Sequence, residues 1–318
     1  MINRNLGKTL IIANPTAHSG KGLAGAEFCN RFFDSYESIR TSYDMQLTKA
    51  AGDATKIAQE AGAYDTVIAL GGDGVIHEVI QGLMEIDKAI RPCLGIIPMG
   101  SGNDYAKTLG MVANDPDASI HQLLSSDKRQ VEVGWVQSDE QSCYFMETLS
   151  FGLDAAIAID TTNRRAKGTS TEGEQLFISS GMKIFSSSKG KWRCKAIFDK
   201  NEEVDITTTV FAINVGATYG GGFKIVPDAD PSDGYLDVCY SQKTPNVPTT
   251  LSLFLLARFG RHTKSNILAF RQTKDVTIQF IGDPAPCQAD GEEIIGQNFK
   301  VSVIPDALEV LCSPNISW

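Results

Sequence analysis

The segment that decides the fold is Asp65-Thr-Val-Ile-Ala-Leu-Gly-Gly-Asp-Gly-Val-Ile-His-Glu-Val-Ile80. Its apolar run Thr66–Leu70 predicts a buried strand, and the spacing of apolar residues over Val75–Glu85 predicts a helix after the glycine turn. The three glycines allow backbone N–H groups to approach a phosphate, and the start of the helix adds a partial positive charge. Asp73 would repel a bare phosphate, so the turn favours a Mg²⁺-bound nucleotide. Taken alone, such a turn is more often only a tight link between a strand and a helix.

Two further loops strengthen the case for a nucleotide site. Leu94-Gly-Ile-Ile-Pro-Met-Gly-Ser-Gly-Asn-Asp-Tyr-Ala106 is again a strand, a glycine loop and a helix start, and its Ser101 can donate to a phosphate or a ribose. Asp104 in this loop can face a metal ion or cap the helix, and the two roles are compatible. After the first predicted strand, Asn14-Pro-Thr-Ala-His-Ser-Gly-Lys-Gly22 supplies hydroxyl groups and Lys21 near a helix start. Because such loops follow successive strand ends, we expect them to converge on one crevice.

The first 130 residues repeat this order of strand and helix, which predicts a mostly parallel sheet covered by helices. From about Val131 longer strand-like runs predominate, which favours an antiparallel β-sandwich interrupted by helices at Ala155–Lys167 with Glu174–Phe185 and at Val247–Phe259. The expected fold is therefore α/β plus all-β, with an α/β domain over 1–130 and a sandwich over 131–318 whose last strand is able to return to the first domain. The predicted segments of the first domain are Thr9–Ala13 then Gly22–Tyr36, Arg40–Leu47 then Asp53–Gly62, Thr66–Leu70 then Val75–Glu85, and Cys93–Pro98 then Asp104–Leu109. The predicted strands of the second are Val131–Gln137, Cys143–Leu149, Trp192–Asp199, Asp205–Val215, Tyr235–Ser241, Asp275–Ile281 and Lys300–Ile304.

Composition narrows the class of protein. A chain of 318 residues exceeds the size of one ordinary core, and its net charge of −9 argues against general nucleic-acid binding. No run of apolar residues is long enough to span a bilayer, and the N-terminal residues lack the pattern of a signal peptide. The seven cysteines stand singly, without a CxxC pair, which argues against a disulfide framework and a zinc site. These features predict a soluble protein of the reducing cytoplasm.

Local charge and hydropathy suggest two rival surfaces for peripheral contact with a membrane. Between Thr161 and Lys195 eight basic residues stand against two acidic ones, and Lys183–Lys195 also contains Phe185 and Trp192. Such a segment can bind anionic lipid, although a solvated loop and strand edge is an equally good interpretation. The apolar run Leu251–Phe259 is the rival, and on a helix such a run more often indicates core packing.

The motifs together resemble one family. NPT-x-x-SGKG from Asn14, GGDG-x-x-x-EV from Gly71, P-x-GSGND-x-A from Pro98 and Ala-Asp-Gly-Glu at 289–292 are similar to the diacylglycerol kinase catalytic-domain family. This family includes bacterial soluble diacylglycerol kinases, YegS-like lipid kinases, and the sphingosine and ceramide kinases. The resemblance covers nearly the whole chain and implies the fold type shared by NAD kinases and diacylglycerol kinases. It implies an ATP- and Mg²⁺-dependent kinase whose acceptor is a lipid hydroxyl, in the first instance diacylglycerol, with phosphatidic acid as product.

The resemblance also implies site residues. Glu292 would be the base that takes the proton of the acceptor hydroxyl, Asp290 would support it, and Asp73 and Asp104 would organise metal and water. Without the upstream loops, the segment around Gly291 would be interpreted as an acidic hairpin turn. A structural Mg²⁺ would lie in the second domain, although the same composition also makes a plain surface turn; its ligands would be Asp230, Asp233 and the carbonyl of Tyr235. Thr48 would otherwise be interpreted as a helix cap. The implied ATP site comprises Asn14, Pro15, Thr16, Ala17, His18, Thr48, Gly71, Gly72, Asp73, Gly74, Val75, Ile76, His77, Glu78 and Ser101.

Departures from the family pattern keep alternatives open. Val75 and His77 stand where the family usually has Thr and Asn, and this difference is the sole support for a non-catalytic lipid- or nucleotide-binding regulator. The pair Gly100 and Gly102 resembles the sphingosine and ceramide branch, so a sphingoid base, ceramide or phosphatidylglycerol are alternative acceptors. An NAD kinase is a further alternative because it uses a similar GGDG loop. Analogy with the family also allows a homodimer.

Overall fold

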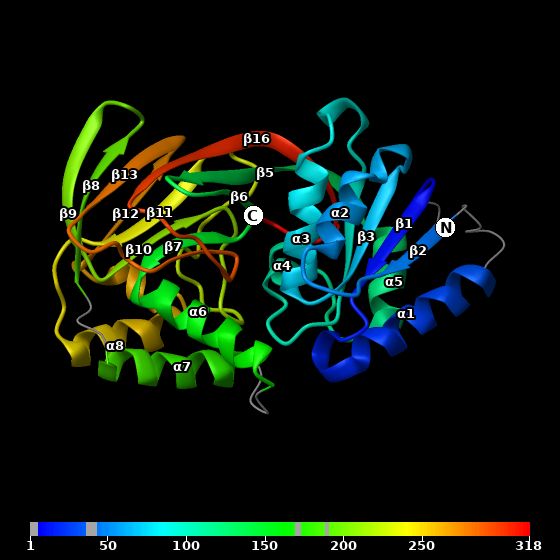
Figure 1. Cartoon of the computed structure of the whole chain (residues 1–318), viewed down its shortest axis with the longest axis horizontal. Helices are drawn as coiled ribbons and strands as arrows, with labels where there is room; N and C mark the ends of the chain where they lie inside the picture. Colours follow the sequence, from blue (N-terminus) through cyan, green and yellow to red (C-terminus); the bar gives the residue numbers. More distant parts are fainter. Residues whose placement is uncertain (1–5, 36–42, 169–172, 188–190) are drawn as a thin grey trace. The chain divides into compact units, whose positions relative to one another are not determined.

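The computed structural model describes residues 6–35, 43–168, 173–187 and 191–318, and it forms two compact units (Figure 1). The first unit comprises residues 1–131 with 306–317, and the second comprises residues 132–305 with Trp318. The chain passes from one unit to the other within strand β5 (Asp127–Ser138) and again within strand β16 (Asn298–Cys312). The first unit is therefore built from two separate stretches of sequence.

A parallel sheet in the order β2-β1-β3-β4 forms the centre of the first unit, and the end of β16 joins it where Val310 lies opposite Leu94. Strands β1, β3 and β4 are buried along their whole length, as their apolar runs predict. Helices α1 and α5 cover one face and α2 and α3 the other (Figure 1). The elements are β1 (Thr9–Ala13), α1 (Ala17–Ser35), β2 (Tyr43–Leu47), α2 (Asp53–Gln59), β3 (Thr66–Gly71), α3 (Asp73–Met84), β4 (Cys93–Pro98), α4 (Asp104–Thr108) and α5 (Pro116–Ser125), with short 3-10 turns at Ala61–Ala63 and Lys88–Ile90.

Helix α1 begins at Ala17, so the predicted start at Gly22 was wrong. The side chain of Asn14 accepts hydrogen bonds from the backbone N–H of Thr16, at 3.0 Å, and from its hydroxyl group, at 2.8 Å. This turn starts the helix early. A Cβ atom at Gly22 would lie 2.1 Å from the carbonyl oxygen of Asn14, so a glycine within the first helical turns allows the helix to pack against the strand end.

The second unit contains two antiparallel sheets that pack face to face. One runs in the order β12-β11-β10-β7-β14-β15, and the other pairs β16, β13, β8 and β9, with β5 and β6 alongside β16. Phe151 of the first sheet lies 5.5 Å from Phe280 and 4.8 Å from Phe299 of the second, measured between ring centroids. This aromatic core confirms the predicted sandwich type. The strands are β6 (Ser142–Phe145), β7 (Thr148–Gly152), β8 (Trp192–Phe198), β9 (Glu202–Thr208), β10 (Val210–Asn214), β11 (Leu236–Ser241), β12 (Leu268–Thr273), β13 (Asp275–Ile281), β14 (Cys287–Ala289) and β15 (Glu292–Glu293).

Three helices pack on the other face of the six-stranded sheet: α6 (Leu153–Ala166), α7 (Gly173–Ser187) and α8 (Val247–Ala257) (Figure 1). A 3-10 turn, Arg261–Lys264, follows α8. Because side chains alternate along a strand, Phe211 points into the sandwich while its neighbour Ala212 contributes to the cluster under the helices.

Four of the strands predicted for the second domain differ from the structure by more than one residue at an end, and the first of them, Val131–Gln137, is strand β5 and begins at Asp127. The run Asp205–Val215 is two strands, β9 and β10, which belong to different sheets and separate at Thr209. The run Cys143–Leu149 is also two strands, because the backbone N–H groups between β6 and β7 are bonded to a distant carboxylate described below. The predicted Lys300–Ile304 is part of the 15-residue strand β16.

Candidate active site

The loops that follow β1, β2, β3 and β4 lie at one edge of the parallel sheet. Ala13 is opposite both Leu47 and Leu70, and Gly71 is opposite Pro98, so the four strands end at nearly the same level. The backbone N–H of Asn14 donates to the carbonyl of Leu70 at 2.9 Å. The edge therefore collects the starts of helices α1, α3 and α4, whose N–H groups favour an anion.

The first of these loops contains the predicted residues Asn14 to His18. Asn14 is fixed by its bonds to Thr16, and Pro15 between them lies at the entrance to α1. His18 adopts a positive φ of 46°, and its Nδ1 lies 3.2 Å from Oδ1 of Asn114. The side chains of Asn14 and Thr16 thus shape the turn, and Ala17 is the first residue of the helix.

The glycine loops after β3 and β4 pack against each other backbone to backbone. A Cβ atom at Gly100 would lie 2.5 Å from Cα of Gly72, and one at Gly71, whose φ is +155°, would lie 2.4 Å from Val75. The N–H of Met99 donates to the carbonyl of Gly71 at 2.7 Å. A side chain at Gly100 would force the loops apart, and one at Gly71 would displace the start of α3. Packing does not require a glycine at position 74, because a Cβ atom at Gly74 would meet nothing within 4 Å.

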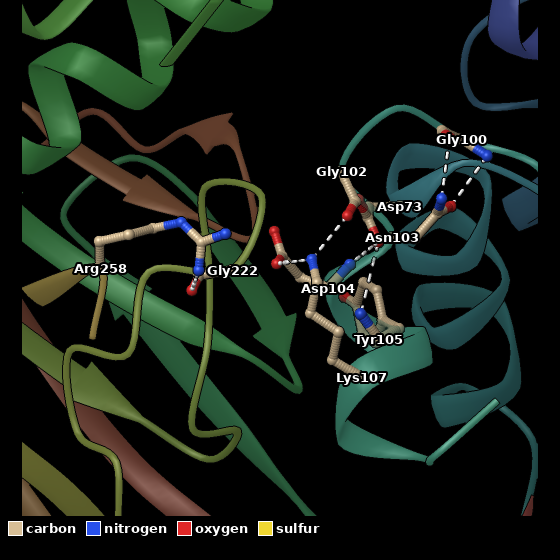
Figure 2. Close-up of polar contacts among 9 residues, drawn as sticks. All are labelled: Asp73, Gly100, Gly102, Asn103, Asp104, Tyr105, Lys107, Gly222 and Arg258. Atoms are coloured by element: carbon tan, nitrogen blue, oxygen red, sulfur yellow. Dashed lines mark hydrogen bonds and ion pairs between the residues drawn. The ribbon is translucent and has the colours of Figure 1, made fainter. Parts of the chain in front are cut away.

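Asp73 and Asp104 are brought together by these loops (Figure 2). Oδ1 of Asp73 accepts the N–H of Asp104 at 2.8 Å and that of Tyr105 at 3.4 Å, so Asp73 caps the start of α4 from the neighbouring loop. Asp104 is only 7% exposed, and its Oδ1 lies 2.9 Å from Nζ of Lys107. Lys107 also donates to the carbonyl of Gly102 at 2.7 Å.

The Oδ2 atoms of both carboxylates lie close to Gly102. A Cβ atom at Gly102 would lie 2.7 Å from Oδ2 of Asp73 and 3.6 Å from Oδ2 of Asp104, so a side chain at this position would collide with the Asp73 carboxylate. Asn103 fixes the loop, because its side chain donates to and accepts from the backbone of Gly100, both at 2.8 Å (Figure 2). Oxygen donors of this kind suit Mg²⁺.

Several predicted ATP-site residues contribute no side chain at this edge. Val75, Ile76 and His77 are buried on α3, so any contact they make with a ligand would come from the backbone. Glu78 accepts the N–H groups of Gly52, at 2.9 Å, and Ala54, at 3.1 Å, and so binds the start of α2 to α3.

Thr48 and Ser101 are both partly exposed at the edge. Thr48 donates its backbone N–H to the carbonyl of Ala13 at 2.9 Å. The alternative interpretation of Thr48 as a helix cap was wrong, because Gly52 is the N-cap residue of α2 and Asp53 accepts the N–H groups of the preceding turn.

In the second unit, the carboxylate of Asp290 is held by three backbone N–H groups. Its oxygens accept from Met146 at 2.9 Å, Glu147 at 3.1 Å and Thr148 at 2.8 Å, and these bonds separate β6 from β7. Because its oxygens are bonded to these N–H groups, Asp290 positions the turn that contains it. Glu292, two residues later in β15, has an exposed side chain.

The turn around Gly291 is fixed from two sides. The N–H of Gly291 donates to Oε1 of Gln288 at 2.6 Å, and its carbonyl accepts from the hydroxyl group of Thr162 at 3.1 Å. Glu292 is thus an accessible carboxylate on a rigid support.

The predicted metal ligands lie in a turn with several neighbouring carboxylates. Asp230 accepts the N–H of Ser232 at 2.9 Å, and Asp233 accepts that of Tyr235 at 2.9 Å. Glu132 and Asp237 lie buried beside this turn, and each leaves one carboxylate oxygen without a hydrogen bond.

Burial, together with the charges of Asp233 and Asp230, raises the pKa of Glu132 to about 8 and that of Asp237 to about 7. This concentration of carboxyl groups would fit a cation at the turn, because a cation would favour their ionised forms. Within the described residues, no three or more His, Cys, Asp or Glu side chains converge on a metal position, so a backbone carbonyl such as that of Tyr235 would have to complete the ligands.

An apolar cavity of about 70 Å³ lies in the second unit between the six-stranded sheet and helices α6, α7 and α8. Its wall includes Ile157, Phe177, Leu253 and Phe254. The apolar lining suits a small apolar group or part of a hydrocarbon chain.

One polar pair borders the cavity. Oδ2 of Asp154 accepts the hydroxyl of Tyr219 at 2.6 Å, and burial raises the pKa of Asp154 to about 6. Sequence patterns did not single out the pair of Asp154 and Tyr219, and they did not single out Lys107, Glu132 or Asp237 either. Of these residues only Lys107, three positions after Asp104, carried a local signal.

A nucleotide-type α/β sheet joined in one chain to an antiparallel sandwich defines the class of two-domain kinases to which NAD kinases and diacylglycerol kinases belong. The family model "Diacylglycerol kinase catalytic domain" matches residues 8–136, and "YegS C-terminal NAD kinase beta sandwich-like domain" matches residues 148–312. The chain belongs to this family of ATP-dependent lipid kinases.

Similar proteins agree with this assignment. The chain is 27% identical to the diacylglycerol kinase of Bacillus subtilis (strain 168), over 89% of this chain and 88% of the other. It is 28% identical to a "Probable lipid kinase YegS-like" of Yersinia pestis (strain Pestoides F), over 85% and 87% of the two chains.

Solved structures share the fold. A crystal structure of a diacylglycerol kinase from Bacillus anthracis matches with a TM-score of 0.72 at 19% identity, over 99% of this chain and 100% of the other. An NAD kinase from Archaeoglobus fulgidus, solved with ATP, matches at 0.53 and 11% identity, over 97% and 94%. None of the helices in the described ranges is long and apolar enough to cross a membrane.

Proposed function

We propose that this kinase transfers the γ-phosphate of ATP to the hydroxyl group of diacylglycerol and so forms phosphatidic acid, acting at a membrane surface. The observation that carries the proposal is the pair of carboxylates, Asp73 and Asp104, that meet beside Gly102 at the starts of two helices. The arrangement offers N–H groups for phosphate oxygens and carboxylates for a metal ion in the same place.

The residues of the first unit would bind and orient ATP. Backbone N–H groups at the starts of α1 and α3 would hold phosphate oxygens, and Thr48 and Ser101 would line the edge of the site. Asp73 and Asp104 would hold Mg²⁺, and Lys107 fixes Asp104 from the other side. When bound, Mg²⁺ neutralises charge on the transferring phosphoryl group.

Glu292 would act as the base on the acceptor. Its carboxylate takes the proton of the hydroxyl group as that oxygen forms a bond to the γ-phosphorus, and ADP leaves with the electrons of the broken bond. Asp290 would hold the turn that carries Glu292, because its own oxygens are occupied by three N–H groups. In the second unit, Asp230, Asp233 and the Tyr235 carbonyl would hold a structural Mg²⁺.

The apolar cavity favours a lipid acceptor over NAD, since its wall would bind a hydrocarbon chain and offers few partners for a dinucleotide. The test is transfer of labelled γ-phosphate in mixed micelles that contain diacylglycerol, ceramide, sphingosine or phosphatidylglycerol, with NAD assayed separately. We expect label in phosphatidic acid. Label in another lipid would identify that lipid as the acceptor in place of diacylglycerol. Label in NAD would overturn the lipid assignment. Nucleotide binding without any transfer would favour a non-catalytic regulator.

A matched pair of variants tests the base. Glu292→Gln should lower the transfer rate by about 10²–10⁴-fold with ATP affinity unchanged, because the proton acceptor is lost. Glu293→Gln changes the adjacent exposed carboxylate and should retain the wild-type rate. Equal rates in the two variants would remove Glu292 from the mechanism.

A further inference from the structure

Helix α8 is apolar on two opposite faces. Its inner face, with Thr250, Leu253, Phe254 and Ala257, lines the cavity. On its outer face the side chains of Val247, Leu251 and Leu255 are 61%, 38% and 50% exposed, and Phe259 just after the helix is 70% exposed. These four residues recur every fourth position and form one stripe, called here the α8 stripe. A helix that is apolar on all sides is normally covered, by protein or by lipid.

The segment of sequence that contains the α8 stripe carries only positive charges. The segment from Val238 to Lys274 contains six basic residues and no acidic one, although the whole chain carries a net charge of −9. Arg261 and Lys264, in the turn after α8, are exposed, and neither has an ion-pair partner in the described part of the chain. Arg258 donates to the carbonyl of Gly222 at 3.4 Å (Figure 2), and its guanidinium carbon lies 6.0 Å from the centroid of the Phe259 ring.

The rival basic segment, Lys183–Lys195, is less suited to bind a membrane. Lys183 lies 2.5 Å from Asp160, and Lys195 lies 2.7 Å from Glu203, so two of its cations face acidic partners. Lys189 lies outside the described residues, as does the side chain of Phe185. The described contacts therefore favour the surface on α8.

We propose that the α8 stripe, together with Arg261 and Lys264, docks this kinase on an anionic lipid bilayer. The stripe enters the boundary between headgroups and acyl chains, and the two cations contact anionic headgroups. The partner follows from the charge, since an apolar stripe flanked by cations alone complements an anionic lipid surface. The proposal deepens the proposed function, because the inner face of the same helix lines the cavity assigned to the acyl chain.

Vesicle flotation without ATP tests the docking surface, so the result does not depend on turnover. Wild-type protein should float with vesicles that contain phosphatidylcholine and phosphatidylglycerol. The apolar variant Leu255→Gln/Phe259→Gln and the charge variant Arg261→Glu/Lys264→Glu should each reduce bound protein by about tenfold. Their matched controls, Ile281→Gln and Lys300→Glu, change exposed residues of the same unit and should bind as wild type.

Two further readouts separate the outcomes. Both α8 variants should retain the wild-type thermal midpoint and the wild-type rate on a short-chain, monomeric diacylglycerol, and lose activity only on vesicles, whereas the controls should keep their activity on vesicles. Unchanged flotation of both α8 variants would overturn the proposal. The proposal would also be overturned if wild type formed a dimer and the apolar variant were monomeric but still floated with the vesicles. The stripe would then be a contact between two copies of the chain. Flotation without phosphate transfer by wild type would retain the docking surface and remove the proposed function.

Discussion

The Asp73 carboxylate has a structural role at the start of α4 and a proposed role in catalysis, and the two can be separated. Asp73→Asn keeps an oxygen that accepts the N–H of Asp104 but removes the negative charge. We expect the transfer rate to fall by at least about 10²-fold and the free energy of unfolding to change by less than about 0.5 kcal/mol. Asp73→Ala also removes the cap and should cost about 1 kcal/mol of stability.

Initial rates and thermal denaturation measure both effects. The control is Asp115→Ala, which removes the carboxylate that accepts the N–H of Ala118 and caps α5 in the same unit. It should lose about 1 kcal/mol of stability and keep its transfer rate. If Asp73→Asn transferred phosphate as fast as wild type, Asp73 would have only a structural role.

The buried pair Asp154 and Tyr219 makes stability depend on pH. In the folded protein Asp154 keeps its proton up to about pH 6, whereas its ordinary pKa is 3.8. The folded state therefore binds more protons between these values, and stability falls as pH rises through this window. The loss due to this group is about 3 kcal/mol, from about 1.4 kcal/mol per pKa unit.

Asp154→Asn still accepts the hydroxyl of Tyr219 but cannot titrate, so it should lack this pH dependence. The difference between the free energies of unfolding of wild type and of the variant should therefore decline from pH 4 to about pH 6. Denaturant titration at several pH values gives this difference. Tyr219→Phe removes a hydrogen bond that lowers the pKa of Asp154, so it should extend the decline to higher pH. Parallel curves for wild type and Asp154→Asn would show that Asp154 does not titrate there.

At the scale of elements, the turn between Asp230 and Tyr235 should bind a divalent cation. Its neighbours Glu132 and Asp237 are buried acids with raised pKa values, and a cation would relieve their mutual repulsion. In an Asp73→Asn background without nucleotide, Mg²⁺ should raise the thermal midpoint, because a ligand that binds only the folded state stabilises it.

The additional change Asp233→Asn should abolish the effect of Mg²⁺ on the midpoint. Asp283→Asn, which changes an exposed carboxylate in the connection from β13 to β14, should leave that effect intact. The same rise in midpoint with both variants would place the bound cation elsewhere.

Local chemistry explains which elements were predictable. The strands that end at Ala13, Gly71 and Pro98 follow from apolar runs and glycine turns, and these signals lie within a few residues of the structure they specify. The division of Cys143–Leu149 was not predictable, because it depends on a carboxylate at Asp290, more than 140 residues later. The pairing of Asp154 with Tyr219 is equally remote, since it joins a helix to a loop 65 residues away.

For the molecule as a whole, the first unit depends on the end of the chain. Leu308, Val310 and Leu311 are almost fully buried, and Val310 lies beside Leu94 of β4. Glu309 pairs with Lys128 at 2.8 Å, and the N–H of Ser313 donates to the carbonyl of Leu109 at 2.9 Å. Residues 306–317 thus complete the sheet whose edge carries the proposed ATP site.

Leu308→Ala should therefore destabilise the first unit by about 3 kcal/mol, the usual cost of a cavity left by a buried leucine. Leu236→Ala makes the same change in β11 of the second unit, where Leu236 is also fully buried. Thermal unfolding with and without ATP distinguishes the units, because ATP should raise the midpoint of the transition that Leu308→Ala lowers. If ATP instead raised the midpoint of the transition that Leu236→Ala lowers, the nucleotide would bind the second unit. Asp73 and Asp104 would then not form the ATP site.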